Sequence, residues 1–149
     1  MKNRKQGLDF IVRVVSMLAV LVGATRVLAQ PASELVNMKH HPLKFDKAIG
    51  APAARFGEGR LKQMDVTIVE IPAGGQLPLH RHLAEEMMYV ISGKGHVQMW
   101  NQAKGRKEEY DWKEGDYLSP TLNSYHQYTN ASKTEPARIL LMTSTPLIR

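Results

Sequence analysis

From residue 61 onward, short apolar or alternating runs are separated by turns rich in glycine and proline. These runs have the length of β-strands and are rich in β-branched or aromatic residues. They cover residues 61–71, 86–92, 96–102, 107–112, 116–119, 125–129 and 138–143. The intervening segments carry turn residues, as in Pro72-Ala73-Gly74-Gly75. Because no long segment shows a helical period, the pattern predicts an all-β fold, a sandwich or a barrel.

The run from Glu86 to Ser92 is apolar on both of its faces. Met88 and Val90 alternate with Met87 and Tyr89, and successive side chains of a strand point to opposite sides. Both faces of such a strand must be buried. One face packs in the barrel interior, and the other packs against another part of the chain or a partner subunit. Since symmetric dimers are the commonest soluble oligomers, we expect a homodimer.

The first 29 residues have the pattern of a secretory signal. A basic start is followed by an apolar run and by small residues before Gln30. The apolar run between Arg13 and Arg26 has 12 uncharged residues, whereas a bilayer-spanning helix needs about 20. We therefore expect residues 1–29 to be a cleaved signal peptide. The mature protein is then periplasmic or secreted, with no stable membrane anchor.

The remaining sequence is predicted to contain one folded domain. Residues 30–59 are expected to form an N-terminal arm and the entry to the domain, and residues 60–149 the barrel. The chain of 149 residues has a hydrophobic fraction of 43%, which is enough for a core. It has no cysteine, which excludes disulfides, thiolate metal ligands and a cysteine nucleophile.

The basic charge of the chain lies mostly in the leader. Residues 1–29 hold five basic residues and one acidic residue, which is +4 of the net charge of +6. The rest has 15 basic and 13 acidic residues, or +2. A nearly balanced domain has no electrostatic reason to bind DNA or RNA, so we expect no nucleic-acid partner.

His80, His82 and Glu86 have the spacing of a metal site built from two neighbouring strands. Two histidines that lie two positions apart on a strand project from the same face. A turn through residues 83–85 then returns Glu86 beside the imidazoles. Imidazole and carboxylate suit first-row divalent metals, and a site of few protein ligands leaves positions open for a substrate or oxygen.

The segment 115–130 offers a fourth ligand. A glycine turn leads into a short strand, Pro120 and Asn123 interrupt it, and a strand resumes near Tyr125. His126 lies in that second strand and is the candidate ligand.

These two segments resemble the two motifs of the cupin superfamily. The first cupin pattern is G-x5-H-x-H-x3,4-E-x6-G. Gly74, His80, His82, Glu86 and Gly93 match it at every position.

The second cupin pattern is G-x5-P-x-G-x2-H-x3-N, and the match to it is incomplete. Gly115, His126 and Asn130 occupy its glycine, histidine and asparagine positions. Pro120 comes one residue early, and Asn123 stands where the pattern has its second glycine. Asparagine is the residue after glycine that most readily adopts a left-handed conformation, so we expect the turn to be kept.

The resemblance implies a double-stranded β-helix, or jelly-roll barrel, with a metal centre inside. It implies one divalent transition metal, among Fe, Mn, Ni, Zn and Cu, bound by four side chains. The four implied ligands are His80, His82, Glu86 and His126.

A metal-dependent enzyme that acts on a small molecule is the function that the resemblance favours, with dioxygenase as the first choice. Glu86 would then serve as a ligand and also as a catalytic base. Met88 and Val90 share the face of Glu86 and are expected to line the substrate cavity. Tyr128 shares the face of His126 and either lines the cavity or packs in the core.

Several alternatives remain open at the level of sequence. The ligand pattern is also compatible with a metal-free barrel, and Glu85 is a second carboxylate, although strand parity turns it outward. A cupin isomerase, lyase or decarboxylase fits the same residues. So does a non-catalytic module that binds a sugar or metabolite. A ligand-sensing half of a transcription factor is disfavoured, because the sequence has no DNA-binding segment and carries a secretory leader.

Overall fold

The computed structural model describes residues 34–101 and 105–144, and the predicted signal peptide lies outside these residues. The described strands, in chain order, are β1 (Lys44–Asp46), β2 (Ala51–Phe56), β3 (Asp65–Ile71), β4 (Glu86–Ser92), β5 (Lys94–Trp100), β6 (Lys107–Lys113), β7 (Tyr117–Leu118), β8 (Tyr125–Asn130) and β9 (Ala137–Thr143). Within the same residues, no helix is long and apolar enough to cross a bilayer. The predicted all-β fold is confirmed.

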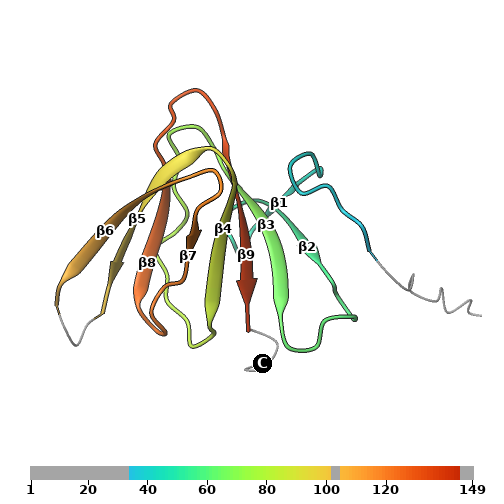
Figure 1. Ribbon diagram of the computed structural model, residues 1–149, viewed down its shortest axis with the longest axis horizontal. Coiled ribbons are helices and arrows are strands. Elements are labelled where there is room, and N and C mark those ends of the chain that lie inside the picture. Colours follow the sequence, from blue (N-terminus) through green and yellow to red (C-terminus); the bar gives the residue numbers. More distant parts are fainter. Residues whose placement is uncertain (1–33, 102–104, 145–149) are drawn as a thin grey trace, which may run out of the picture. The chain divides into compact units, whose positions relative to one another are not determined.

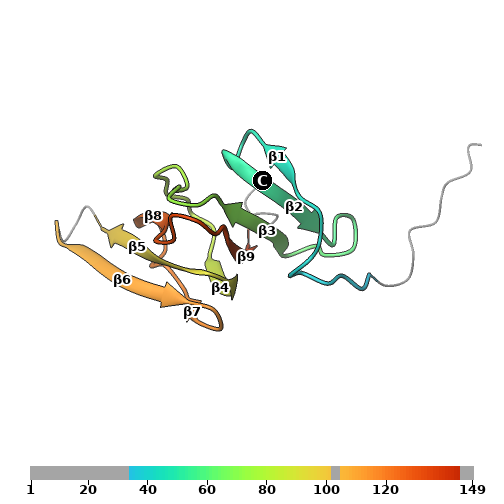
Figure 2. The same ribbon diagram turned by 90° about the horizontal axis from the view of Figure 1, so that it is seen from above.

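The strands form two antiparallel sheets, which Figures 1 and 2 show from two directions. The larger sheet has the order β1-β2-β3-β9-β4-β7, and the smaller has the order β6-β5-β8. The segment that follows β3 bridges to β8 through the pairs Gln76↔Thr129 and His80↔His126. In the view from above, β5, β6 and β8 lie on one side and β1, β2 and β3 on the other (Figure 2). Strands distant in sequence are therefore neighbours, as in a jelly roll.

Each run predicted as a strand overlaps one, and β4 has the predicted bounds. Strands β1 and β2 were not predicted, and they lie in the segment assigned to the arm and the domain entry. The reason is the composition of β2, which begins Ala51-Pro52-Ala53-Ala54 and has weak strand propensity. Pairing with β3, for example Ala53↔Val69, makes it a strand.

The inward face of the larger sheet changes from apolar to polar along its strands. At one end, Val69, Val90 and Ile139 are fully buried in the main core. Toward the other end, the row Asp65–Thr143–Glu86 runs across β3, β9 and β4. One half of the interior is thus a packed core, and the other half offers polar groups for a site.

The outer face of the same sheet is covered by the segment before β1. Phe56, Ile68 and Leu140 form a second buried cluster, and Val36, Met38, Leu43 and Ile91 are among the residues that pack against it. Ile91 belongs to β4, so this chain supplies part of the second cover that β4 needs. The homodimer stays a prediction.

Candidate metal centre

Two adjacent backbone segments place the histidines. The amide N–H of His126 donates to the carbonyl of His80 at 2.9 Å, and that of His80 donates back at 3.2 Å. Residues paired directly across antiparallel strands have side chains on the same face. His82 follows two positions after His80, and Glu86 opens β4 after the turn. The local pairing therefore brings four side chains from three segments together.

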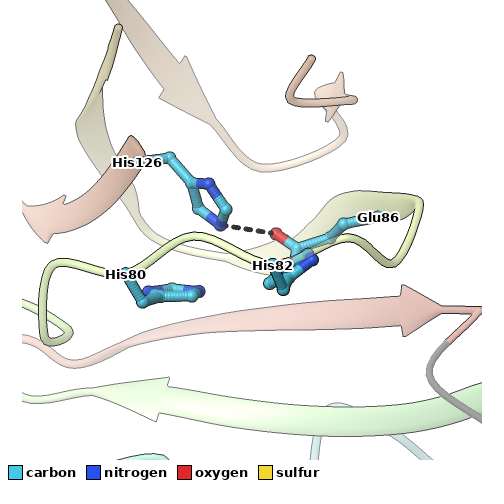
Figure 3. Close-up of side chains that lie close together, drawn as sticks. All are labelled: His80, His82, Glu86 and His126. Carbon is cyan, nitrogen blue, oxygen red and sulfur yellow. Dashed lines mark hydrogen bonds and ion pairs between the residues drawn. The ribbon is translucent and has the colours of Figure 1, made fainter. Parts of the chain in front are cut away.

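The four predicted ligands converge in the structure (Figure 3). One ligand atom from each of His80, His82, Glu86 and His126 can be chosen so that all lie within 4.8 Å of one another. The Nε2 atom of His82 lies 3.1 Å from Oε2 of Glu86. The Nε2 atom of His126 lies 3.6 Å from Oε1 of the same carboxylate. The cluster could hold a metal ion.

Backbone carbonyl groups orient all three imidazoles. The Nδ1 atoms of His80, His82 and His126 lie 2.8, 2.9 and 3.0 Å from the carbonyl oxygens of Pro78, Ala84 and Ser124 respectively. A carbonyl oxygen can only accept a hydrogen bond, so each Nδ1 carries the proton. In a neutral ring the lone pair is then on Nε2, which is the state in which histidine binds a metal. The Nε2 atom of His82 also forms a hydrogen bond with Glu86, which raises the pKa of His82, so a metal would compete with a proton there.

Glu86 is a buried carboxylate held in its ionised form. Burial by itself raises the pKa of Glu86, but the His82 hydrogen bond, the nearby His126 and the Tyr128 hydroxyl together lower it below its usual value. The Tyr128 hydroxyl donates to Oε1 at 2.7 Å. These contacts suit a ligand better than a catalytic base. Glu85, in contrast, is exposed.

The donor set fits a divalent transition metal. His126 is buried, and its Nε2 atom has no hydrogen-bond partner within the described part of the chain. Burial lowers the pKa of His126, so the ring is kept neutral. A buried nitrogen without a partner is costly unless something binds it. Three imidazole nitrogens and one carboxylate are ligands that first-row divalent metals accept.

The second sequence motif supports the site through its backbone. Asn123 has a φ of 59°, as its position in the motif predicts, and its N–H donates to the carbonyl of His82 at 3.1 Å. Ser119 donates its hydroxyl to the carbonyl of Glu86 at 2.8 Å. Asn130 donates its amide group to the carbonyls of Ile71, Pro72 and Glu135. The turn within the second motif is therefore tied to the segments that carry His82 and Glu86.

A pocket of about 330 Å³ opens beside the cluster and is lined in part by His80, His82 and Glu86. Met88 and Val90 share the inward face with Glu86 as predicted, but both are fully buried in the core and are absent from the pocket lining. Burial at the apolar end of the interior explains the difference.

Tyr128 is likewise buried in the core and bonds to Glu86, and it too is absent from the pocket lining. The lining includes Ile49 and Arg55, which sequence reasoning missed. The segment that carries them has low strand propensity and no alternation in its sequence, so no clear signal was available.

A family model described as a cupin domain matches residues 67–143, which include all four clustered residues. The chain belongs to the cupin family. This cupin is 26% identical over 91 residues to auxin-binding protein 4 of Zea mays, a match that covers 59% of the chain and 45% of the relative. It is 24% identical over 93 residues to auxin-binding protein T85 of Nicotiana tabacum, covering 60% and 50%. The chain thus spans about half the length of these curated relatives.

Solved cupin structures share the fold. A cupin 2 conserved barrel protein from Salinispora arenicola superposes with a TM-score of 0.59 at 16% identity, over 76% of this chain and 89% of that one. Oxalate decarboxylase from Lactobacillus farciminis gives 0.59 at 24% identity, over 71% of this chain and 31% of that one. At these identities the likeness concerns the fold alone.

Proposed function

We propose that this cupin is a metal-dependent enzyme of the dioxygenase class, acting on a small molecule at one divalent metal held by His80, His82, Glu86 and His126. The observation that carries the proposal is the set of three Nδ1–carbonyl bonds around one ionised carboxylate. These bonds leave the three Nε2 atoms as the ring nitrogens that could bind a metal, at the edge of an open pocket.

The protein groups have separate tasks in this proposal. The three imidazoles and Glu86 hold the metal, and the Tyr128 hydroxyl keeps the Glu86 carboxylate ionised and oriented. Ile49, Ala84 and Leu141 give the pocket apolar wall, which excludes water from part of it. When bound, a divalent metal supplies Lewis acidity, and a redox-active one also supplies reactivity toward dioxygen.

A non-catalytic binding function is the second candidate. It is favoured by the names of the two curated relatives, which are called auxin-binding proteins. A small metabolite would then occupy the same pocket and use the metal as an anchor. Because both candidate functions require the metal, metal binding does not distinguish them, and a measurement of substrate turnover does.

The metal site is tested by stoichiometry. We expect the purified chain to bind about one equivalent of a divalent transition metal, with the His82→Ala and His126→Ala variants each losing most of it. His96→Ala is the matched control, because His96 is a partly exposed histidine of β5 and not a member of the cluster. Metal retention in both ligand variants, or no metal uptake by the parent chain, would contradict the proposal.

The reaction class is tested by oxygen consumption with the metal-loaded protein. The substrates are a 1,3-diketone, a flavonol and a catechol, each of which presents two oxygen atoms to a metal. We expect uptake with at least one, dependent on His126. If a substrate binds tightly but is not converted with any of the metals tested, the binding function is favoured instead.

A further inference from the structure

The pocket beside the ligand cluster also has a guanidinium group in its lining. Residues Ala51 and Ala53 of β2 face the main core, so Arg55, two positions further, lies on the same inward face. It pairs with Thr67 of β3, where that face becomes polar. Arg55 lines the same pocket as His80, His82 and Glu86. One pocket thus has the candidate metal ligands and a cationic side chain in its wall.

The guanidinium of Arg55 is only partly used by the protein. Its Nη2 atom bonds to Oδ2 of Asp46 at 3.0 Å. This bond uses one of the three nitrogen atoms of the guanidinium. The side chain is 37% exposed, so these remaining N–H groups are accessible from the pocket and from solvent. Arginine presents its donors in a planar fork that matches a carboxylate.

Asp46 is itself held in place, which orients the arginine. Its Oδ1 atom accepts the backbone N–H of Ala48 at 2.8 Å and that of Ile49 at 3.3 Å. Its other oxygen is thereby left for Arg55. Burial opposes ionisation of Asp46, but the Ala48 amide, the Arg55 guanidinium and the Ile49 amide together lower its pKa. An exposed ion pair adds little stability, so its main effect here is to position the guanidinium.

A bound metal would make the charges of the pocket compatible with an anion. Its lining has two carboxylates, Asp65 and Glu86, and one guanidinium, Arg55. A divalent metal would offset the two carboxylates, and Arg55 is itself paired with Asp46, which is not part of the lining. Asp65 lies opposite Thr143 in the strand register.

We propose that Arg55 is the anion-binding residue of this pocket and that the ligand is a small carboxylate whose other end is an oxygen group bound at the metal centre. This inference rests on the proposed metal site. A ligand of this class spans the pocket, with the fork of Arg55 holding one end and the cluster of His80, His82, Glu86 and His126 facing the other. Asp46 is then a positioning residue.

The test uses the full chain loaded with Co²⁺, whose absorption spectrum reports on its ligands. The probes are linear dicarboxylates from malonate to adipate, and the monoamide of the one that binds best. Calorimetry gives the Kd of each. We expect the dicarboxylate to bind about 10- to 100-fold more tightly than its monoamide. The reason is that the monoamide lacks the second carboxylate, with which Arg55 would form charge-assisted hydrogen bonds. Arg55→Gln should reduce this ratio to about one.

Control variants separate a local effect from a general one. Arg106→Gln removes the same charge from an exposed arginine that lines a different pocket, and it should keep the preference. Arg55→Lys should keep part of it, since a lysine retains charge but not the fork. Asp46→Asn should weaken the preference without changing Co²⁺ stoichiometry, and a full preference in Asp46→Asn would contradict the positioning role.

The two proposals fail in different ways. If the parent chain takes up Co²⁺ but no dicarboxylate binds, or Arg55→Gln binds the dicarboxylate as tightly as the parent, the inference on Arg55 is wrong and the metal site stands. If the parent chain takes up no Co²⁺, the proposed function is wrong, and the inference falls with it.

Discussion

Tyr128 connects the packed core to the metal centre. Its ring is fully buried, while its hydroxyl donates to Glu86 at 2.7 Å. Burial, followed by the charge of Glu86, raises the pKa of Tyr128 well above its usual value, so the group stays a donor. A carboxylate in this position would otherwise face the cost of burial with fewer partners. Of the two places that the sequence left open for Tyr128, the structure shows the core, and from there its hydroxyl holds the candidate ligand Glu86.

Tyr128→Phe removes this hydroxyl and keeps the ring. We expect the free energy of unfolding of the metal-free protein to fall by about 1 kcal/mol, because a buried acceptor loses a donor. We expect metal affinity to fall about 10- to 100-fold, as for other groups that support a metal ligand. Denaturant titration and competitive metal titration measure the two effects.

The matched control is Tyr110→Phe. Tyr110 also donates its hydroxyl to a carboxylate, that of Glu108 at 3.0 Å, but on the exposed strand β6. We expect a change below about 0.5 kcal/mol and unaltered metal affinity. Equal effects of the two substitutions on metal affinity would show that Tyr128 does not act through Glu86.

Among the strands, β5 depends on a glycine for its place beside β8. A Cβ atom at Gly95 would collide with the carbonyl oxygen of Thr129 and with the ring of Trp112. Trp112 is buried in the core and comes from β6. The close approach of the indole to the backbone of β5 lets the core extend to the edge of the smaller sheet.

Gly95→Ala should therefore lower the free energy of unfolding by about 3 kcal/mol or more, because neither a carbonyl of a paired strand nor a packed indole can move away cheaply. Gly105→Ala is the comparison. Gly105 has a φ of 59° but open space around it, so backbone strain of about 1 kcal/mol is expected there. Denaturant unfolding measures both, and a smaller loss for Gly95→Ala than for Gly105→Ala would contradict the packing argument.

Besides its apolar packing, the segment before β1 is held against the larger sheet by Arg138. Nη1 of Arg138 donates to the carbonyls of Met38, Lys39 and His41, and its Nε donates to Glu70 at 2.8 Å. Because carbonyl oxygens within the segment accept these bonds, they do not depend on the identity of its side chains.

Arg138→Met should loosen this segment and leave the metal centre intact. We expect amide hydrogen exchange in residues 34–43 to accelerate by about tenfold or more, since the segment loses three charge-assisted hydrogen bonds. Exchange in β4 and metal stoichiometry should stay as in the parent chain. Exchange that accelerates equally in β4 would instead mean that Arg138 stabilises the whole sheet.

For the molecule as a whole, metal binding and folding are expected to be coupled. The ligands come from the segment after β3, from β4 and from β8, so one ion would join both sheets. A ligand at about 1,000 times its Kd stabilises the folded state by about 4 kcal/mol.

Removing the metal with a chelator should therefore lower Tm by about 10 °C, and adding it back should restore Tm. Scanning calorimetry of the same sample before and after dialysis measures this. His126→Ala is the control, and its Tm should not respond to the chelator. An equal response in His126→Ala would place the stabilising metal elsewhere.

Much of the fold could be predicted because strand periodicity and turn residues are local properties. The runs now seen as β3 to β9, and the Asn123 turn, follow from side-chain alternation and from backbone conformations that few residues adopt. Strand β2 could not be predicted, because its alanines and proline become a strand only by pairing with β3. Arg55 was missed for the same reason.

The sequence by itself determined which four side chains form the cluster, since the spacing of His80, His82 and Glu86 and the position of His126 are patterns along the chain. Only the tertiary structure decided the chemistry around them. The carbonyls that orient the imidazoles and the Tyr128 hydroxyl on Glu86 come from backbone geometry and from contacts across the barrel. Arg55 reaches the same pocket by strand pairing. Spacing is a local property of the sequence, whereas burial and hydrogen bonding between distant segments depend on how the two sheets pack together.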